Sequence, residues 1–121
     1  MEIVFWLGRI LFGGFFAING LNHLLKVNQL APYAASKKVP APRVAVIATG
    51  LLLLAGGLAV LTGLYVRIGL WLLVLFLVLV TPWMHNFWTV QDPMQRMGEQ
   101  VNFLKNIGLL GAVLLLLYFW S

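Results

Sequence analysis

The sequence predicts an all-α integral membrane protein built as one bundle of four transmembrane helices. Composition is the first reason: 62% of the 121 residues are hydrophobic and only 9% are charged, whereas charged residues make up about a quarter of a typical soluble domain. Length is the second, because a helix needs about 20 apolar residues to cross a hydrocarbon core of about 30 Å. Four stretches meet this requirement and use up most of the chain, so we expect one domain over residues 1–121: residues 3–25, 41–63, 66–85 and 101–120.

The first apolar stretch carries polar residues along one helical face. Arg9, Asn19 and His23 follow helical spacing through Phe16, so they share a stripe. For Arg9 two readings stay open: the side chain snorkels to the membrane surface, or it meets a buried partner or ligand. The stretch is too long for the apolar core of a secretion signal, and Glu2 stands where a signal has basic residues. We therefore expect this helix to stay in the mature protein.

Residues 26–42 form the longest connector before the second stretch. Leu30, Tyr33 and Ala34 share a helical face, which favours a short helix at the membrane interface. An irregular loop with a lysine-rich edge fits the composition equally well. The second stretch has no ionisable side chain over residues 44–64, and its glycines and alanines predict close contact with neighbouring helices.

Residues 81–106 hold the densest cluster of polar side chains, where the third stretch ends and the fourth begins. Polar groups beside hydrocarbon are costly unless they find partners or water, so this cluster is the first place to look for function. Because the first and third helices run in the same direction, His23 and His85 must reach the same membrane side, where the fourth helix starts. We expect a shared cavity there. Its candidate ligand-binding residues are Asn19, His23, His85, Asn86, Asn102 and Asn106, with Arg9, Asp92, Glu99 and Lys105 as supporting candidates.

Neutral histidines and carboxamides around such a cavity suit a quinone headgroup, because they can bond its two oxygens. Aromatic residues would cover the ring, and the candidates are Phe16, Phe87, Trp88 and Phe103. The alternative is an internal hydrogen-bond network that joins the helices and needs no ligand. Two histidines could also supply both axial ligands of a haem, but nothing else in the sequence requires haem. The chain has no cysteine and its histidines lack metal-site spacing, so we expect no intrinsic cofactor or metal, and we assign no catalytic residue.

The net charge of +5 indicates orientation in the membrane rather than nucleic-acid binding. The connectors after the first and third stretches, residues 26–42 and 86–100, hold or adjoin most of the lysines and arginines. The opposite side has only Arg67 and, within reach, Arg9. Basic residues are enriched in cytoplasmic loops. We therefore expect both connectors in the cytoplasm, both termini outside, and a lipid bilayer around the bundle.

Short motifs along nearly the whole chain resemble those of the DoxX family of small four-helix membrane proteins. They are Arg9 with the run 13–16, Gly20–His23, Tyr33–Lys37 followed by Val39–Pro40, Gly56–Leu58, His85–Trp88, Asp92–Pro93 and Phe103–Asn106. The resemblance implies an inner-membrane protein linked to quinone-coupled oxidation of sulfur compounds, because some relatives look like subunits of a thiosulfate:quinone oxidoreductase. Others look like membrane partners of soluble redox or detoxifying enzymes.

Two functions follow from this resemblance. In the first, the chain is a quinone-linked membrane subunit that serves a partner oxidoreductase. In the second, it is an anchor or assembly subunit that docks a partner protein and does no chemistry. A protein partner or a homo-oligomer is expected in both.

The sequence departs from the family pattern at two positions. Leu53 stands where many relatives carry a glutamate shortly before the paired glycines of the second stretch, so a buried carboxylate that could move protons is missing. Lys38 stands where the family pattern has glycine. That lysine argues against a left-handed helix cap, since a side chain strains this conformation.

Overall fold

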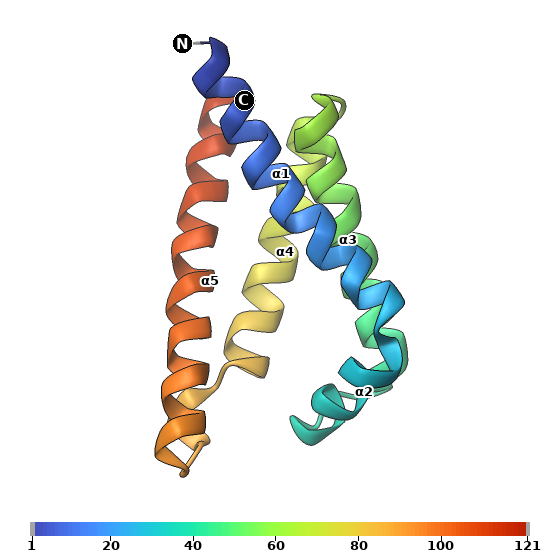
Figure 1. The fold of residues 1–121 in the computed structure, drawn as a ribbon, viewed down its shortest axis with the longest axis vertical. Helices are drawn as coiled ribbons and strands as arrows, with labels where there is room; N and C mark the ends of the chain where they lie inside the picture. The colour runs from blue at the N-terminus through green and yellow to red at the C-terminus, as the bar shows by residue number, and fades with distance from the viewer. Residues whose placement is uncertain (1, 121) are drawn as a thin grey trace.

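The computed structural model describes residues 2–120, and within that range it contains helices and no strand. The elements shown in Figure 1 are α1 (Glu2–Leu25), α2 (Val27–Ser36), α3 (Pro42–Thr62), α4 (Val66–Met84), the 3-10 helix η1 (Phe87–Thr89) and α5 (Pro93–Phe119). The helices α1, α3, α4 and α5 are each long and apolar enough to cross a membrane. The predicted fold class, an all-α membrane bundle, is therefore confirmed.

α1 and α3 cross with their backbones in direct contact. A Cβ atom added to Gly20 would stand 2.4 Å from the Leu54 nitrogen, and one added to Gly57 would stand 2.4 Å from the Ala17 nitrogen. No larger residue fits at either position without separating the helices. Small residues let helices approach closely in membranes, where lipid-facing leucines give little drive for association. The close contact predicted from the glycines of the second stretch is thus confirmed.

Arg9 joins α1 to the C-terminal end of α3, at the end of the bundle away from α2 (Figure 1). Its Nε donates to the Val60 carbonyl at 3.0 Å, and its Nη2 donates to the Leu61 carbonyl at 3.0 Å. The last carbonyls of a helix have no partner within it, and a positive charge is favourable beside them. The guanidinium also lies 4.3 Å from the ring centroid of Trp6. Arg9 thus has partners within the protein at the end of α3, and its side chain is half-buried.

The connector after α1 contains a helix, so the loop alternative is wrong for the segment that forms α2. α2 packs on α3 through Val27 and Ala34, which are buried together with Val46. Of the face predicted for the connector, Ala34 is buried and Leu30 partly buried by this packing, while Tyr33 stays 39% exposed. The packing also places Tyr33 beside the C-terminal end of α4, where the Tyr33 hydroxyl lies 3.5 Å from the Met84 carbonyl oxygen.

A left-handed cap ends α2, although the residue at that position is lysine. Lys38 has a φ of 62°. Its N–H donates to the Ala35 carbonyl at 2.9 Å, and the Val39 N–H donates to the Ala34 carbonyl at 3.2 Å, which are the paired bonds of a Schellman cap. The expectation that the lysine excludes a left-handed cap at this position is therefore wrong. The conformation costs an L-residue about 1–2 kcal/mol, and the two hydrogen bonds with the packing of Val39 offset that cost.

α5 is the long helix that the others enclose least. Its buried residues are Asn106, Val113 and Leu117. It packs along α4 and η1, and it approaches α1 near their ends, where the rings of Phe5 and Trp120 are 5.8 Å apart. Figure 1 shows α1 and α5 diverging from those ends toward α2. The bundle is therefore wider where α2 lies.

Candidate functional site

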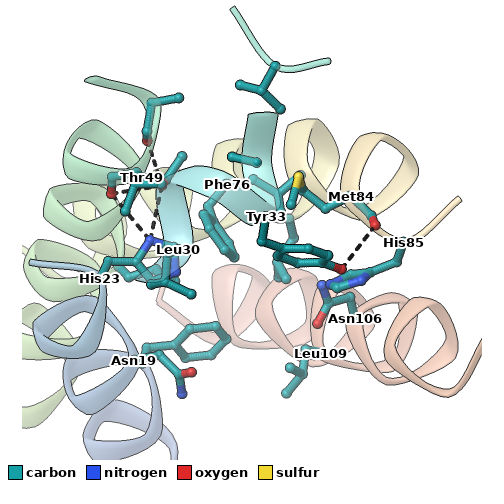
Figure 2. A pocket seen from close by; sticks show the side chains of 18 of the residues that line it. Asn19, His23, Leu30, Tyr33, Thr49, Phe76, Met84, His85, Asn106 and Leu109 are labelled. Atoms are coloured by element: carbon teal, nitrogen blue, oxygen red, sulfur yellow. Dashed lines mark hydrogen bonds between the residues drawn. The ribbon is translucent and has the colours of Figure 1, made fainter. Parts of the chain in front are cut away.

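A cavity of about 220 Å³ lies at this wide end, between the four long helices and α2 (Figure 2). Most of its wall is apolar or aromatic, with side chains from every one of these helices. The polar residues that line it are Asn19, His23, Tyr33, Thr49, His85, Lys105 and Asn106. Both histidines thus reach one cavity, as the parallel course of the first and third long helices predicts.

His23 enters the cavity from α1 and is held by α3. Its Nδ1 lies 3.1 Å from the Thr49 hydroxyl oxygen and 3.3 Å from the Val46 carbonyl oxygen. A carbonyl can only accept, and the Thr49 hydroxyl already donates to the Ala45 carbonyl at 2.7 Å. The partners therefore assign the hydrogen to Nδ1, which makes Nε2 the acceptor atom of a neutral ring. Within residues 2–120, Nε2 has no hydrogen-bond partner.

His85 follows α4 directly and enters from the opposite side of the cavity (Figure 2). Its Nδ1 lies 3.1 Å from Oε1 of Glu99 in α5. Because a carboxylate can only accept, this nitrogen also carries the hydrogen. The Nε2 atom of His85 is then an acceptor as well, and the described part of the chain gives it no partner.

Glu99 joins three elements of the structure at the edge of the cavity. Its Oε2 accepts from the Tyr33 hydroxyl at 2.8 Å and from Nζ of Lys37 at 2.8 Å. Lys37 in turn donates to Oδ1 of Asn86 at 2.9 Å. The side chains of Lys37 and Glu99 are only 14% and 12% exposed, so this ion pair is largely shielded from solvent. It links the segment after α2, the chain after α4, and α5.

Tyr33 remains a hydrogen-bond donor in this cluster. Burial, the hydrogen bond to Glu99 and the negative charge of that carboxylate all raise the pKa of Tyr33 above its ordinary value. The phenol therefore stays protonated at physiological pH and continues to donate to Glu99. It also forms part of the wall between the cavity and the outside, because Tyr33 lines both sides.

Asn106 is the residue of the cavity wall that most directly indicates a bound molecule. It is only 6% exposed, and its side-chain amide bonds to no other residue in the range 2–120. An asparagine amide offers two donors and an acceptor, and the Asn106 amide opens onto the cavity, since Thr81 Oγ1 is the one side-chain polar atom within residues 2–120 that is both fully buried and unpartnered. Buried polar groups in folded proteins almost always have a partner. This amide therefore calls for water or a ligand inside the cavity.

The structure brings four of the six predicted ligand-binding residues to this cavity: Asn19, His23, His85 and Asn106. The amide of Asn19 donates to its own helix, at 2.7 Å from the Phe15 carbonyl. Lys105 also lines the cavity, with its Nζ 5.9 Å from the ring centroid of Phe15.

The other predicted residues lie elsewhere. Asn86, Asn102 and Glu99 line a second, polar cleft on the outside of the Tyr33–Glu99 contact, which we call the outer cleft. Asp92 caps α5, because its Oδ2 accepts from the Gln95 nitrogen at 3.0 Å. Arg9 lies at the other end of the bundle, as described above.

The aromatic residues expected to cover a ring need correction. Phe16 does line the cavity, but Phe87, Trp88 and Phe103 form a separate cluster with ring centroids 5.4–5.7 Å apart. They lie outside because η1 turns the chain away from the cavity and packs it on α5. The rings that line the cavity beside Phe16 are Phe15, Tyr33 and Phe76.

Sequence reasoning missed Tyr33, Lys37 and Thr49 as site residues. Tyr33 and Lys37 are four residues apart, a spacing that puts them on one face at the end of α2 and carries both to Glu99. That signal depends on accepting a helix in the connector. Thr49 carries no comparable signal, since its role comes only from the crossing of α1 and α3.

Metal-ligand groups do not gather in the structure. Among the described residues, no three histidine or acidic side chains lie close enough together to hold a metal ion. The site instead combines two imidazoles, a buried amide and a mostly apolar wall.

Fold and cavity together define a small multi-pass membrane protein with a partly open cavity of about 220 Å³ at one end of the bundle. The family model described as DoxX matches residues 4–86, which is more than half of the chain. The chain belongs to the DoxX family. Neither the curated proteins nor the solved structures that were searched contain a match to it. The family match ends before α5, so Glu99, Lys105 and Asn106 lie outside the matched region.

Proposed function

We propose that the cavity binds the headgroup of a quinone and that the chain is a quinone-linked membrane subunit serving a partner oxidoreductase. The amide of Asn106, which opens into the cavity and bonds to no other residue in the range 2–120, is the observation that carries this proposal. It faces a cavity that also receives two imidazoles, each with an unpartnered Nε2. A ring with two oxygen atoms matches such a set of hydrogen-bonding groups.

The size of the cavity supports a ligand of this class. A dry cavity of about 150 Å³ holds one benzene molecule, whereas pockets for drug-sized ligands measure about 300–1,000 Å³. At about 220 Å³, this cavity suits one substituted six-membered ring. The rings of Phe15, Phe16 and Phe76 give it an aromatic wall.

The divergence of α1 and α5 supports a ligand with an apolar tail. Phe15 and Lys105 come from these two helices and both line the cavity, with the Lys105 Nζ 5.9 Å from the ring centroid of Phe15. Phe15 is 40% exposed, so the wall at this place consists of side chains rather than packed backbone. A tail that leaves the cavity between them would continue in lipid.

The proposal also includes an orientation. We infer that the end with α2 and the outer cleft faces the cytoplasm, that both termini lie outside, and that the membrane is the inner one. The basic residues around α2 support this orientation. A soluble partner would then meet the protein at the outer cleft, on the far side of Glu99 from the cavity.

Two leucine substitutions on α5 test the site. Asn106→Leu removes the amide that faces the cavity and should lower the affinity for a short-tailed quinone by at least tenfold, because its bond is lost. Asn102→Leu is the matched control: it lies one helical turn away, lines the outer cleft and not the cavity, and should bind as the parent does. The measurement is titration calorimetry on purified protein in mild detergent. An equal loss of affinity in both variants would contradict the proposal that the quinone binds in the cavity.

The anchor function is the alternative, and one observation favours it. The outer cleft is lined by Lys37, Lys38 and Asn102 among others, and the exposed Met94 and Met97 stand in the first turns of α5. Methionines beside polar groups suit an adaptable protein interface. If neither the parent nor any variant binds quinone or its reduced form, the anchor reading replaces the ligand-binding one.

A further inference from the structure

We infer that the cavity prefers the reduced, hydroquinone form of its ligand to the quinone. This inference rests on the proposed function and adds the redox form that the site holds. It comes from which nitrogen of each histidine is already engaged. The chain has only two histidines, and both line the cavity.

Both imidazoles present an acceptor to the cavity when they are neutral. The Nδ1 of His23 is engaged with the Thr49 hydroxyl and the Val46 carbonyl, and the Nδ1 of His85 is engaged with Glu99. The Val46 carbonyl and the Glu99 carboxylate can accept but cannot donate, so Nδ1 carries the hydrogen in both rings. The other nitrogen, Nε2, is left with a lone pair and no hydrogen.

The two redox forms of the ligand differ in the same property. A quinone has two carbonyl oxygens, which only accept hydrogen bonds. A hydroquinone has two hydroxyl groups, which can donate. Opposite an Nε2 lone pair, a hydroxyl makes a hydrogen bond, whereas a carbonyl sets one acceptor against another and stays unpaired. Figure 2 shows His23 and His85 on opposite sides of the cavity, as two oxygens across a six-membered ring would require.

The other polar side chains that line the cavity do not discriminate between the two forms. The hydroxyls of Tyr33 and Thr49 already donate within the protein, whereas Asn19 and Lys105 can donate to a carbonyl oxygen and to a hydroxyl oxygen alike. The Asn106 amide can donate to a carbonyl or accept from a hydroxyl, because it carries both kinds of group. It therefore contributes to binding either form. The preference belongs to the histidines, at about tenfold for each one that bonds the ligand.

A preference for the hydroquinone favours electron transfer in one direction. Tighter binding of the reduced form makes the bound quinone easier to reduce, and each tenfold preference raises its two-electron midpoint potential by about 30 mV. The site would thus draw electrons from a partner toward the quinone. That direction agrees with a subunit that delivers electrons to quinone.

The first measurement is nitrogen NMR of the protein labelled with ¹⁵N in histidine. Only two imidazoles contribute signals, and His23→Asn and His85→Asn assign them. At about pH 8, above the range in which imidazole ordinarily titrates, we expect both rings to carry hydrogen on Nδ1. Hydrogen on Nε2 of either ring would overturn the inference, and this result does not depend on whether any ligand binds.

The second measurement compares the affinities of a short-tailed quinone and its hydroquinone under argon at the same pH. We expect the hydroquinone to bind about 10–100 times more tightly. His85→Asn should reduce that ratio by about tenfold, since an amide can donate or accept. Asn106→Leu is the control, because it should weaken both forms and leave the ratio unchanged.

The outcomes distinguish a failure of the hydroquinone preference from a failure of the proposed function. Equal affinities, or tighter binding of the quinone, would overturn the preference and leave the quinone site standing. Absence of binding by both forms would overturn the quinone site, and with it the preference, whatever the NMR result.

Discussion

Replacing Glu99 with alanine should destabilise the bundle far more than the loss of an ordinary surface charge. The carboxylate accepts from Tyr33, Lys37 and His85, and it is only 12% exposed. Each hydrogen bond to a charged group contributes a net of about 1.5–3 kcal/mol to stability. Adding the three contributions overstates the cost of the substitution, because Lys37 keeps its bond to Asn86 and regains water in the outer cleft. We expect the free energy of unfolding to fall by about 2–4 kcal/mol.

Equilibrium unfolding in mixed detergent micelles, followed by tryptophan fluorescence, measures this change. Glu2→Ala is the control, because Glu2 is an exposed acid at the start of α1 and should cost less than about 1 kcal/mol. Lys37→Met in the same background completes a double-mutant cycle, with an expected coupling of about 1–3 kcal/mol to Glu99. A cost below about 1 kcal/mol with no coupling is what a solvated surface pair gives. That result would refute the view that Glu99 joins α2, the chain after α4 and α5 at the edge of the cavity.

Four further changes follow from the packing and the charge distribution. Gly57→Ala should lower the free energy of unfolding by about 1–3 kcal/mol, because its Cβ would meet the Ala17 nitrogen at 2.4 Å. Gly108→Ala, which has open space around it, should raise the same free energy by up to about 1 kcal/mol, and the two variants are compared in one unfolding series. Thr81→Val should be neutral or stabilising by about 1 kcal/mol in that series, since the Thr81 hydroxyl is buried without a partner among the described residues. A reporter fused after residue 121 that is active only in the cytoplasm should stay inactive, and activity there would reverse the inferred orientation.

The helices and their direction could be predicted from the sequence because membrane crossing depends on composition over long stretches. Apolar length alone places four spans, and alternating direction then puts His23 and His85 at the same end. These features come from the length of the apolar stretches and from chain direction, and they do not depend on any particular partner.

The division of the polar residues between the cavity and the outer cleft could not be predicted, because it depends on contacts between separate helices. Asn102 and Asn106 lie one turn apart on α5, yet the contact of Tyr33 with Glu99 leaves one in the outer cleft and the other in the cavity. That contact requires α2, whose composition fits a loop equally well. Phe87 likewise lies near the cavity in sequence, but the 3-10 turn carries it outward to Phe103.

The backbone conformation of Lys38 likewise could not be predicted from the sequence. Local preference disfavours a left-handed lysine by about 1–2 kcal/mol. Two cap hydrogen bonds and the packing of Val39 outweigh that preference. A departure from a family pattern therefore identifies a position under strain, while the conformation there is decided by contacts that the sequence does not display.

The position of the acidic residue, on α5 rather than on α3, affects how its charge is stabilised. Where the family resemblance leads one to expect a glutamate on α3, Leu53 is 2% exposed and forms part of the cavity wall. A carboxylate there would lose its hydration, at a cost of several kcal/mol unless a partner met it. Glu99 instead reaches the cavity edge from α5 with Lys37, Tyr33 and His85 as ready partners. Its negative charge is thus stabilised from the outer cleft while it fixes the hydrogen of His85 on Nδ1. An acid at this position can set the hydrogen-bonding character of the cavity without being buried in the apolar core.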